Sequence, residues 1–161
     1  MNIALPVSHS SETAPTASEM LRSETSFALT VAFRELELFD TGDVEGANEV
    51  FSSDVIDHNP ADSEVSGFDG MTSLITTVRD GFTDTQHRIL FHAELPGGWV
   101  VVHWRMTATH TGDAFGFAGT GTPVALNGCD IMRIAGGKVA EIYHVEQMLQ
   151  LTQQLAAAAE R

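Results

Sequence analysis

The pattern of hydrophobic positions divides the chain into a helical first half and a strand-rich second half. A first helix that ends near Gly42 is predicted by apolar residues at helical spacing, namely Leu21, Leu29, Phe33, Leu36 and Phe39. Asp43 is a suitable cap for a shorter helix that runs to Phe51, and residues 68–82 predict a third helix. The sequence from Glu146 to Glu160 is helical by composition.

Alternation of apolar and polar residues predicts four strands after Thr85, at residues 86–95, 99–110, 124–134 and 138–146. Glycine-rich turns join the members of each pair. A brief strand at Val55-Ile56 ends at the turn His58-Asn59-Pro60. Helices followed by an antiparallel meander, without alternating βαβ units, indicate an α+β fold.

The length of 161 residues suits one domain. Residues 1–18 are rich in Ser, Thr, Ala and Pro, so we expect a flexible N-terminal tail followed by a single domain over residues 19–161. The start has no basic segment before an apolar stretch, and no run of apolar residues approaches a membrane span. We therefore expect a soluble protein of the cytoplasm.

The charge balance narrows the range of partners. The chain has 22 acidic and 8 basic residues and a net charge of −14, and residues 1–64 hold most of the excess. Such a chain repels phosphate backbones and anionic lipids, which disfavours nucleic-acid and membrane binding. The lone Cys129 excludes an internal disulfide bond.

Several chemistries lack their motifs. No HExxH or CxxC occurs, so a metal is not expected, although His58, His103 and His144 could in principle converge. The glycines of residues 112–121 are not set in a βαβ unit, and Lys138 belongs to an exposed turn, which disfavours a dinucleotide and a Schiff base. Cofactor-free acid–base chemistry in an apolar cavity remains.

Asp130 is the most unusual residue of the predicted strands. Met132 and Ile134 follow it on the same face, and an acid on an apolar strand face costs several kcal/mol unless it is paired or protonated. Such a site raises a carboxyl pKa towards the range useful for catalysis. A structural ion pair with Arg105 or Arg133 is an equally good interpretation.

Histidines supply further candidates. His103 shares a strand face with Arg105, opposite an entirely apolar face, and His144 lies beside apolar residues in the last strand. Each histidine more often fills a structural than a catalytic role.

Four stretches resemble the SnoaL-like polyketide cyclase family, which has the nuclear-transport-factor-2-like fold. They are residues 57–60 (DHNP), 66–75 (SGFDGMTSLI), 100–112 (VVVHWRMTATHTG) and 130–147 (DIMRIAGGKVAEIYHVEQ). With the order of the predicted elements, the resemblance covers about residues 25–155. It implies a cone-shaped α+β barrel, in which a curved antiparallel sheet packs against the N-terminal helices around a central pocket.

The resemblance also implies an activity in secondary metabolism, such as antibiotic biosynthesis. The aspartate that matches Asp130 would act as general acid–base in an intramolecular aldol ring closure that needs no cofactor or metal. We expect His103 and His144 to assist Asp130. We expect the following residues to bind the substrate: His58, Asn59, Trp104, Arg105, Met132 and Tyr143.

The sequence departs from the family where a Trp-Asp pair is replaced by Tyr143-His144. His144 could tune Asp130 or bind a substrate phenol. Related epoxide hydrolases, isomerases, dehydratases and hydroxylases share the fold, and a water-activating site built from Asp130, Arg105 and Asn59 is an alternative. A non-catalytic binding domain is a further alternative. A homodimer or homotetramer through the exposed sheet face is expected.

Overall fold

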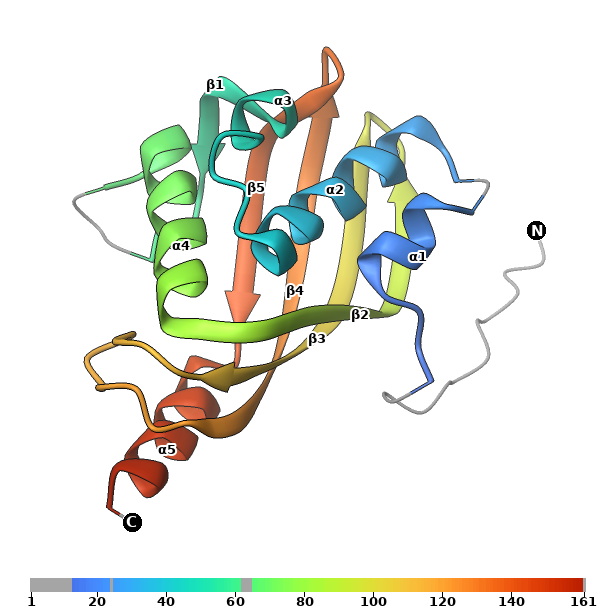
Figure 1. The fold of residues 1–161 in the computed structure, drawn as a ribbon. Coiled ribbons are helices and arrows are strands. Elements are labelled where there is room, and N and C mark those ends of the chain that lie inside the picture. Colours follow the sequence, from blue (N-terminus) through green and yellow to red (C-terminus); the bar gives the residue numbers. More distant parts are fainter. Residues whose placement is uncertain (1–12, 24, 62–64, 161) are drawn as a thin grey trace.

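The computed structural model describes residues 13–23, 25–61 and 65–160, which form a mixed α+β fold (Figure 1). Its elements, in chain order, are α1 (Ala17–Leu21), α2 (Phe27–Thr41), α3 (Ala47–Val50), β1 (Phe51–Asp57), α4 (Gly67–Gly81), β2 (Phe82–Leu95), β3 (Trp99–His110), β4 (Thr122–Ala135), β5 (Lys138–Glu146) and α5 (Met148–Ala159). The predicted fold class is thus confirmed. No helix within the described ranges is both long and apolar enough to span a membrane.

The predicted first helix is in fact two helices. Thr16 and Glu19 form a capping box at the start of α1, while the Ser26 side chain accepts a hydrogen bond from the Leu29 N–H and begins α2. Gly42 ends α2 as predicted, because its φ of 69° is a left-handed conformation that glycine adopts without steric cost.

The other predicted elements occur with shifted ends. The helix expected from Asp43 forms only over Ala47–Val50, while the Asp43 carboxylate accepts a hydrogen bond from the Gly46 N–H in the preceding turn. Strand β2 begins at Phe82 rather than residue 86, through an irregular segment in which Asp84 has a φ of 55°. Because this segment interrupts the alternation of apolar and polar residues, the sequence pattern does not indicate where the strand begins.

The five strands lie in the order β1-β5-β4-β3-β2. The neighbours β2, β3, β4 and β5 are antiparallel, as expected for a meander, but β1 runs parallel to β5. In the β3–β4 register, Val102 lies opposite Asp130 and His103 lies opposite Cys129. This register decides which side chains share a face.

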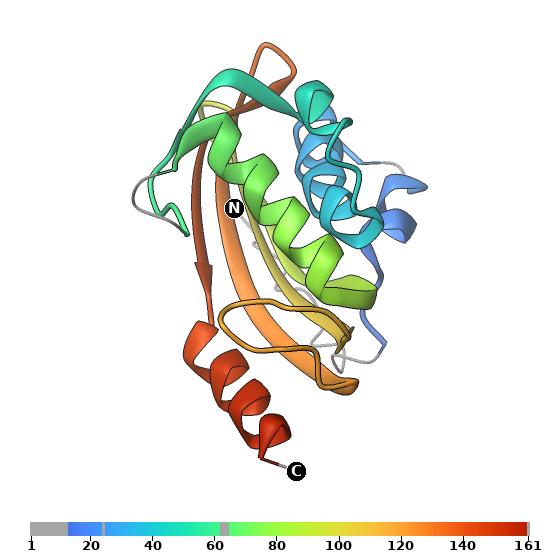
Figure 2. The same ribbon diagram turned by 60° about the vertical axis from the view of Figure 1, so that its left-hand side comes forward.

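The sheet is strongly curved, and α2 and α4 cover its concave face (Figure 2). The core fills the space between them. It is built from one face of α2, the inner face of α4 and the inward residues of the strands, among them Phe33, Leu36, Met71, Ile75, Val100 and Val102. Helix α5 follows β5 and packs Leu151 and Leu155 into the same core.

The segment before α1 is part of the domain. The Ile89 N–H donates to the Pro15 carbonyl oxygen, and the Arg88 guanidinium donates to the Ala14 carbonyl oxygen at 2.8 Å. Ala14 is buried, with 2% of its surface exposed. Residues 14–16 therefore pack against β2 instead of belonging to the flexible tail expected for residues 1–18, and residues 1–12 lie outside the described residues.

Candidate active site

A cavity of about 200 Å³ lies between α2, α4 and the concave face of the sheet. Most of its lining is apolar, including Leu36, Phe39, Met71, Leu74, Val78, Phe82, Met106, Phe115, Leu126, Met148 and Leu151. Polar side chains converge on it from separate elements, and they are Glu35, Asn59, His87, Asp130, His144 and Glu146. A few polar groups in an apolar cavity are typical of a small-molecule site.

Asp130 lies on the inner face of β4, with 3% of its surface exposed. The Trp104 Nε1–H of β3 donates a hydrogen bond to its Oδ2 at 2.5 Å. Gly128 makes this contact sterically accessible, because a Cβ at that position would lie 2.2 Å from the Trp104 ring. The neighbouring strands thus fix the orientation of the carboxyl group.

Burial raises the pKa of Asp130 from 3.8 to about 7, and the negative charge of Glu146 contributes to this shift. The hydrogen bond from Trp104 and the charge of His144 oppose the shift without cancelling it. A carboxyl group with this pKa is present in both charged and neutral forms near neutral pH. Asp130 can therefore both accept and donate a proton there.

His144 is the cross-strand neighbour of Asp130 and is buried, with 5% of its side chain exposed. Its Nδ1 lies 2.8 Å from Glu146 Oε1, and its Nε2 lies 3.1 Å from Asp57 Oδ1. Burial alone would lower the pKa of His144, but Glu146, Asp57 and Asp130 together raise it to about 9. His144 is therefore a cation at neutral pH whose two nitrogens are both occupied, and it acts on Asp130 through its charge.

The expected role of His103 beside Asp130 is wrong. His103 is exposed, on the opposite face of β3 from the cavity, because it lies opposite Cys129 rather than Asp130. Arg105 shares this outer face, where its guanidinium lies 3.4 Å from Asn127 Oδ1. Arg105 therefore does not bind a ligand in the cavity and does not complete the water-activating site considered from the sequence.

The structural ion pair considered for Asp130 is also absent. Arg105 lies on the outer face, and the Arg133 Nε–H donates to Glu141 Oε1 on that same side of the sheet. Within the described residues, neither arginine is paired with Asp130. Asp130 is thus a buried carboxyl group that has no cationic ion-pair partner in direct contact among the residues that the structure describes.

Two of the six expected substrate-binding residues, Asn59 and Trp104, line the cavity. His58 and Tyr143 instead stack on each other outside it, with ring centroids 4.0 Å apart. Met132 points inward, but it is fully buried in the core and does not line the cavity. His58, His103 and His144 therefore do not converge on one point.

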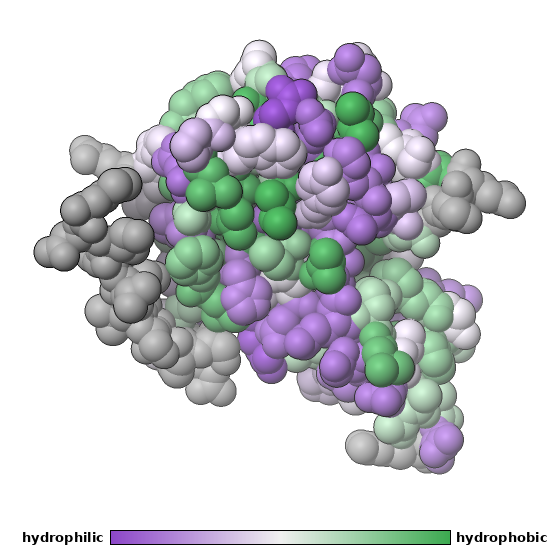
Figure 3. All heavy atoms as spheres, turned by 180° about the vertical axis from the view of Figure 1, so that it is seen from behind, coloured by the Kyte–Doolittle hydropathy of each residue, from purple (hydrophilic) through white to green (hydrophobic). Residues whose placement is uncertain are grey.

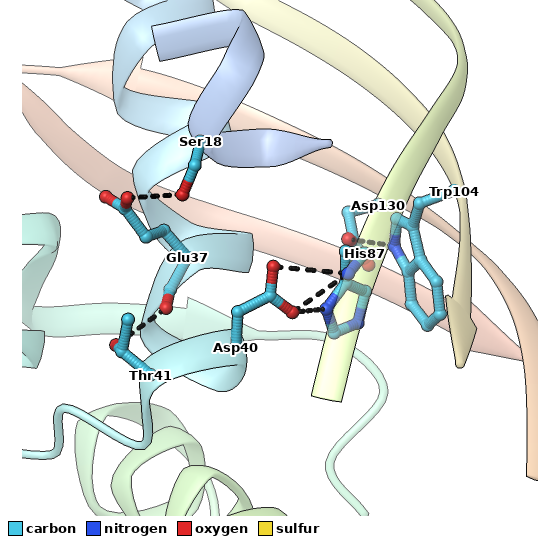
Figure 4. Close-up of polar contacts among 7 residues, drawn as sticks. All are labelled: Ser18, Glu37, Asp40, Thr41, His87, Trp104 and Asp130. Atoms are coloured by element: carbon cyan, nitrogen blue, oxygen red, sulfur yellow. Dashed lines mark hydrogen bonds and ion pairs between the residues drawn. The ribbon is translucent and has the colours of Figure 1, made fainter. Parts of the chain in front are cut away.

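A second His–carboxylate contact supports the cavity wall from α2 (Figure 4). Asp40 Oδ1 lies 2.6 Å from the His87 Nδ1 and 2.9 Å from the His87 backbone N, which donates to it. The His87 ring packs edge-on against the Trp104 ring, with centroids 4.7 Å apart. Asp40 thus positions His87, and His87 supports the indole that binds Asp130.

A family model for the SnoaL-like polyketide cyclase matches residues 30–155, which is more than half of the chain. The chain belongs to this family. The SnoaL-like assignment agrees with the predicted resemblance, and the matched residues include the strands that carry Trp104, Asp130 and His144. No curated protein matches the chain.

Solved structures show that the SnoaL-like domain has the nuclear-transport-factor-2-like fold. TsrD from Streptomyces laurentii is 19% identical, with a TM-score of 0.72 over 84% of this chain and 98% of that chain. A candidate polyketide cyclase from Acidithiobacillus ferrooxidans is 24% identical, with a TM-score of 0.70 over 85% and 99%. AclR from Streptomyces galilaeus, a candidate hydroxylase, is 25% identical, with a TM-score of 0.70 over 81% and 96%.

Four polar residues in or beside the cavity were not among those expected from the sequence: Glu35, Asp40, His87 and Glu146. Glu35 carried a signal, because it follows Ala32 by three positions and precedes Phe39 by four on the apolar face of α2. An acid on an apolar face is the observation that identified Asp130. The Asp40–His87 contact joins residues 47 positions apart, which spacing alone does not reveal.

Proposed function

We propose that the protein closes a ring in a polyketide-like substrate by an intramolecular aldol reaction, with Asp130 as the general acid–base. The main support is the position of Asp130, a buried carboxyl group with a pKa of about 7 in a largely apolar cavity. Family membership supports an enzyme that acts on polyketides. The ring closure itself and the part played by Asp130 are the proposal.

The reaction needs two proton transfers that one carboxyl group can perform in turn. A methylene between two carbonyl groups is acidic, so the Asp130 carboxylate removes one of its protons and leaves an enolate. The enolate carbon attacks a second carbonyl carbon of the same chain, and the neutral Asp130 then returns the proton to the new alkoxide. Atoms and charge balance without a redox step, so the mechanism requires no cofactor or metal.

The surrounding residues favour each step. Trp104 holds the carboxyl group through its Nε1–H, and the cationic His144 limits the cost of the carboxylate form. The apolar lining suits a substrate whose carbonyl groups carry no charge. Confinement of a flexible chain also removes much of the entropy cost of ring closure.

The test is the cyclisation of a synthetic aryl poly-β-ketone by the purified protein and its Asp130→Asn variant. Loss of the proton carrier is expected to lower turnover by about 10²–10⁴-fold. Asp69→Asn is the matched control, because Asp69 is exposed on α4 and is not among the residues that line the cavity. Near-normal turnover by Asp130→Asn would refute the assignment.

Addition of an activated water, as in an epoxide hydrolase, is the alternative reaction class. Asn59 lines the cavity together with Asp130, so the two side chains could bind a water molecule between them. The two reactions differ in the origin of oxygen. In ¹⁸O-labelled water, ring closure is expected to give a new hydroxyl group that keeps the oxygen of the substrate carbonyl group. Addition of water is expected to place labelled oxygen in the product.

Assembly and location are further expectations. We propose a homodimer or homotetramer through the outer face of the sheet, where Ile131, Tyr143 and Val145 are exposed. Seen from behind, the molecule shows apolar side chains grouped among polar ones (Figure 3). Sedimentation equilibrium tests the assembly, and cell fractionation tests the expected cytoplasmic location.

A further inference from the structure

Glu35 presents a buried carboxyl group that the acid–base mechanism does not use. It lies on α2, lines the cavity and has 2% of its surface exposed. Its Oε2 is buried without a hydrogen-bond partner among the described residues. Because an unpaired buried polar group is costly, its presence requires an explanation.

The surroundings of Glu35 favour its neutral form over its charged form. Burial raises the pKa of Glu35 well above its usual value, and the nearby negative charges of Asp130, Glu146 and Asp40 act in the same direction. A neutral carboxyl group carries one O–H donor, whereas a carboxylate only accepts. The cavity is therefore lined by a carboxyl group suited to donate a hydrogen bond from α2 and by Asp130 on β4.

We propose that Glu35 is a second catalytic residue, whose neutral carboxyl group donates a hydrogen bond to the substrate carbonyl oxygen on which negative charge develops. This inference rests on the proposed ring closure. Glu35 forms and breaks no covalent bond to the substrate, and Asp130 still performs both proton transfers. The oxygen that Glu35 binds is a carbonyl oxygen before the reaction and an alkoxide oxygen after carbon–carbon bond formation.

Glu35 also defines the ligand chemistry of this side of the cavity. An oxygen of a carbonyl or phenol group accepts the hydrogen bond, and such a ligand has no full charge to be repelled by Glu146 and Asp130. The unpartnered oxygen of Glu35 then has a function. It destabilises the free protein, but it is already positioned to donate a hydrogen bond when the ligand binds.

Glu35→Met tests this role, since methionine is apolar, similar in length and compatible with a helix. Loss of one such donor is expected to lower kcat by about 10²–10³-fold and to raise KM by a smaller factor, about tenfold, because the hydrogen bond forms with the neutral carbonyl oxygen and strengthens as charge develops. The urea midpoint is expected to rise, because the variant removes a buried unpaired carboxyl group. A purely structural role predicts the reverse pattern, with a lower midpoint and unchanged kcat.

Two further variants complete the set. Glu35→Gln keeps an N–H donor, so its kcat is expected to lie between those of the wild type and Glu35→Met. Glu37→Gln is the control on the same helix, because Glu37 accepts a hydrogen bond from Ser18 outside the cavity (Figure 4). Glu35→Leu is used if Glu35→Met does not fold, and wild-type kcat in either folded apolar variant would overturn the inference.

Binding of 2-naphthol, followed by its fluorescence, tests Glu35 independently of turnover. The phenol oxygen is the acceptor, so Glu35→Met is expected to weaken binding at least tenfold, while Glu37→Gln leaves it unchanged. Equal binding by Glu35→Met and the wild type would overturn the inference even if Asp130 proves essential for ring closure. Weakened binding without any ring closure by the wild type would instead refute only the proposed function.

Discussion

Replacement of Asp130 by asparagine should stabilise the protein, and increasingly so as the pH rises. Asparagine has nearly the same shape as aspartate and keeps an oxygen that can accept the Trp104 hydrogen bond. It removes the cost of ionising a carboxyl group that is 3% exposed. Because the same variant is expected to lose turnover, stability and activity should change in opposite directions.

The magnitude follows from the pKa of Asp130. The pKa is raised from 3.8 to about 7, so between these values the folded state holds a proton that the unfolded state has released. Stability conferred by this group is therefore lost as the pH rises from about 4 to about 7. At about 1.4 kcal/mol per pH unit the total is about 4 kcal/mol, of which about 3 kcal/mol falls between pH 5 and pH 8.

Urea denaturation at several pH values between 5 and 8 measures this effect directly. The free energy of unfolding of Asp130→Asn minus that of the wild type is expected to grow over this range by about 3 kcal/mol. Asp69→Asn, in which an exposed side chain outside the cavity is replaced, is the matched control. A difference that is constant with pH, or a wild type that is the more stable protein at pH 8, would refute the reasoning.

Three further predictions concern the groups around Asp130. Gly128→Ala places a Cβ against the Trp104 ring and should displace the indole. This displacement should lower kcat at least tenfold and change the tryptophan fluorescence. An unchanged fluorescence spectrum would contradict this steric account. Asp40→Asn weakens the contact that positions His87 beside Trp104 and should lower kcat more than it raises KM, whereas equal effects on both would argue against positioning. The pKa of His144 is raised to about 9, so its stabilising contribution should be complete below pH 6.5 and lost as the pH rises through 9, and NMR titration of its ring checks the value.

The strand patterns predict much of the fold because alternation in β3 and β4 is unbroken. They place Val100, Val102 and Asp130 inward, as the structure does. They also place His103 on the face of β3 opposite the apolar one, which the structure confirms. The expected role of His103 beside Asp130 therefore disagreed with the alternation of side chains along the strand. The resemblance to the family did not resolve that conflict, because neither its short sequence stretches nor the order of the elements gives the register of the strands.

Other features of the site depend on contacts between distant elements. Helix α2 brings Glu35 and Asp40 over the sheet, and only the packed structure shows that Asp40 meets His87. The parallel pairing of β1 with β5 places Asp57 against His144, 87 residues away in the chain. Local periodicity describes which face a residue occupies, but it carries no information on which faces meet.

The dependence of kcat/KM on pH for ring closure tests the central role of Asp130 most directly. For the wild type, kcat/KM should rise with pH and level off above an inflection near 7, because the reaction begins with the Asp130 carboxylate. The residual activity of Asp130→Asn should lack this inflection. A wild-type profile that is flat between pH 5.5 and 8.5, or the same inflection in both proteins, would contradict the account.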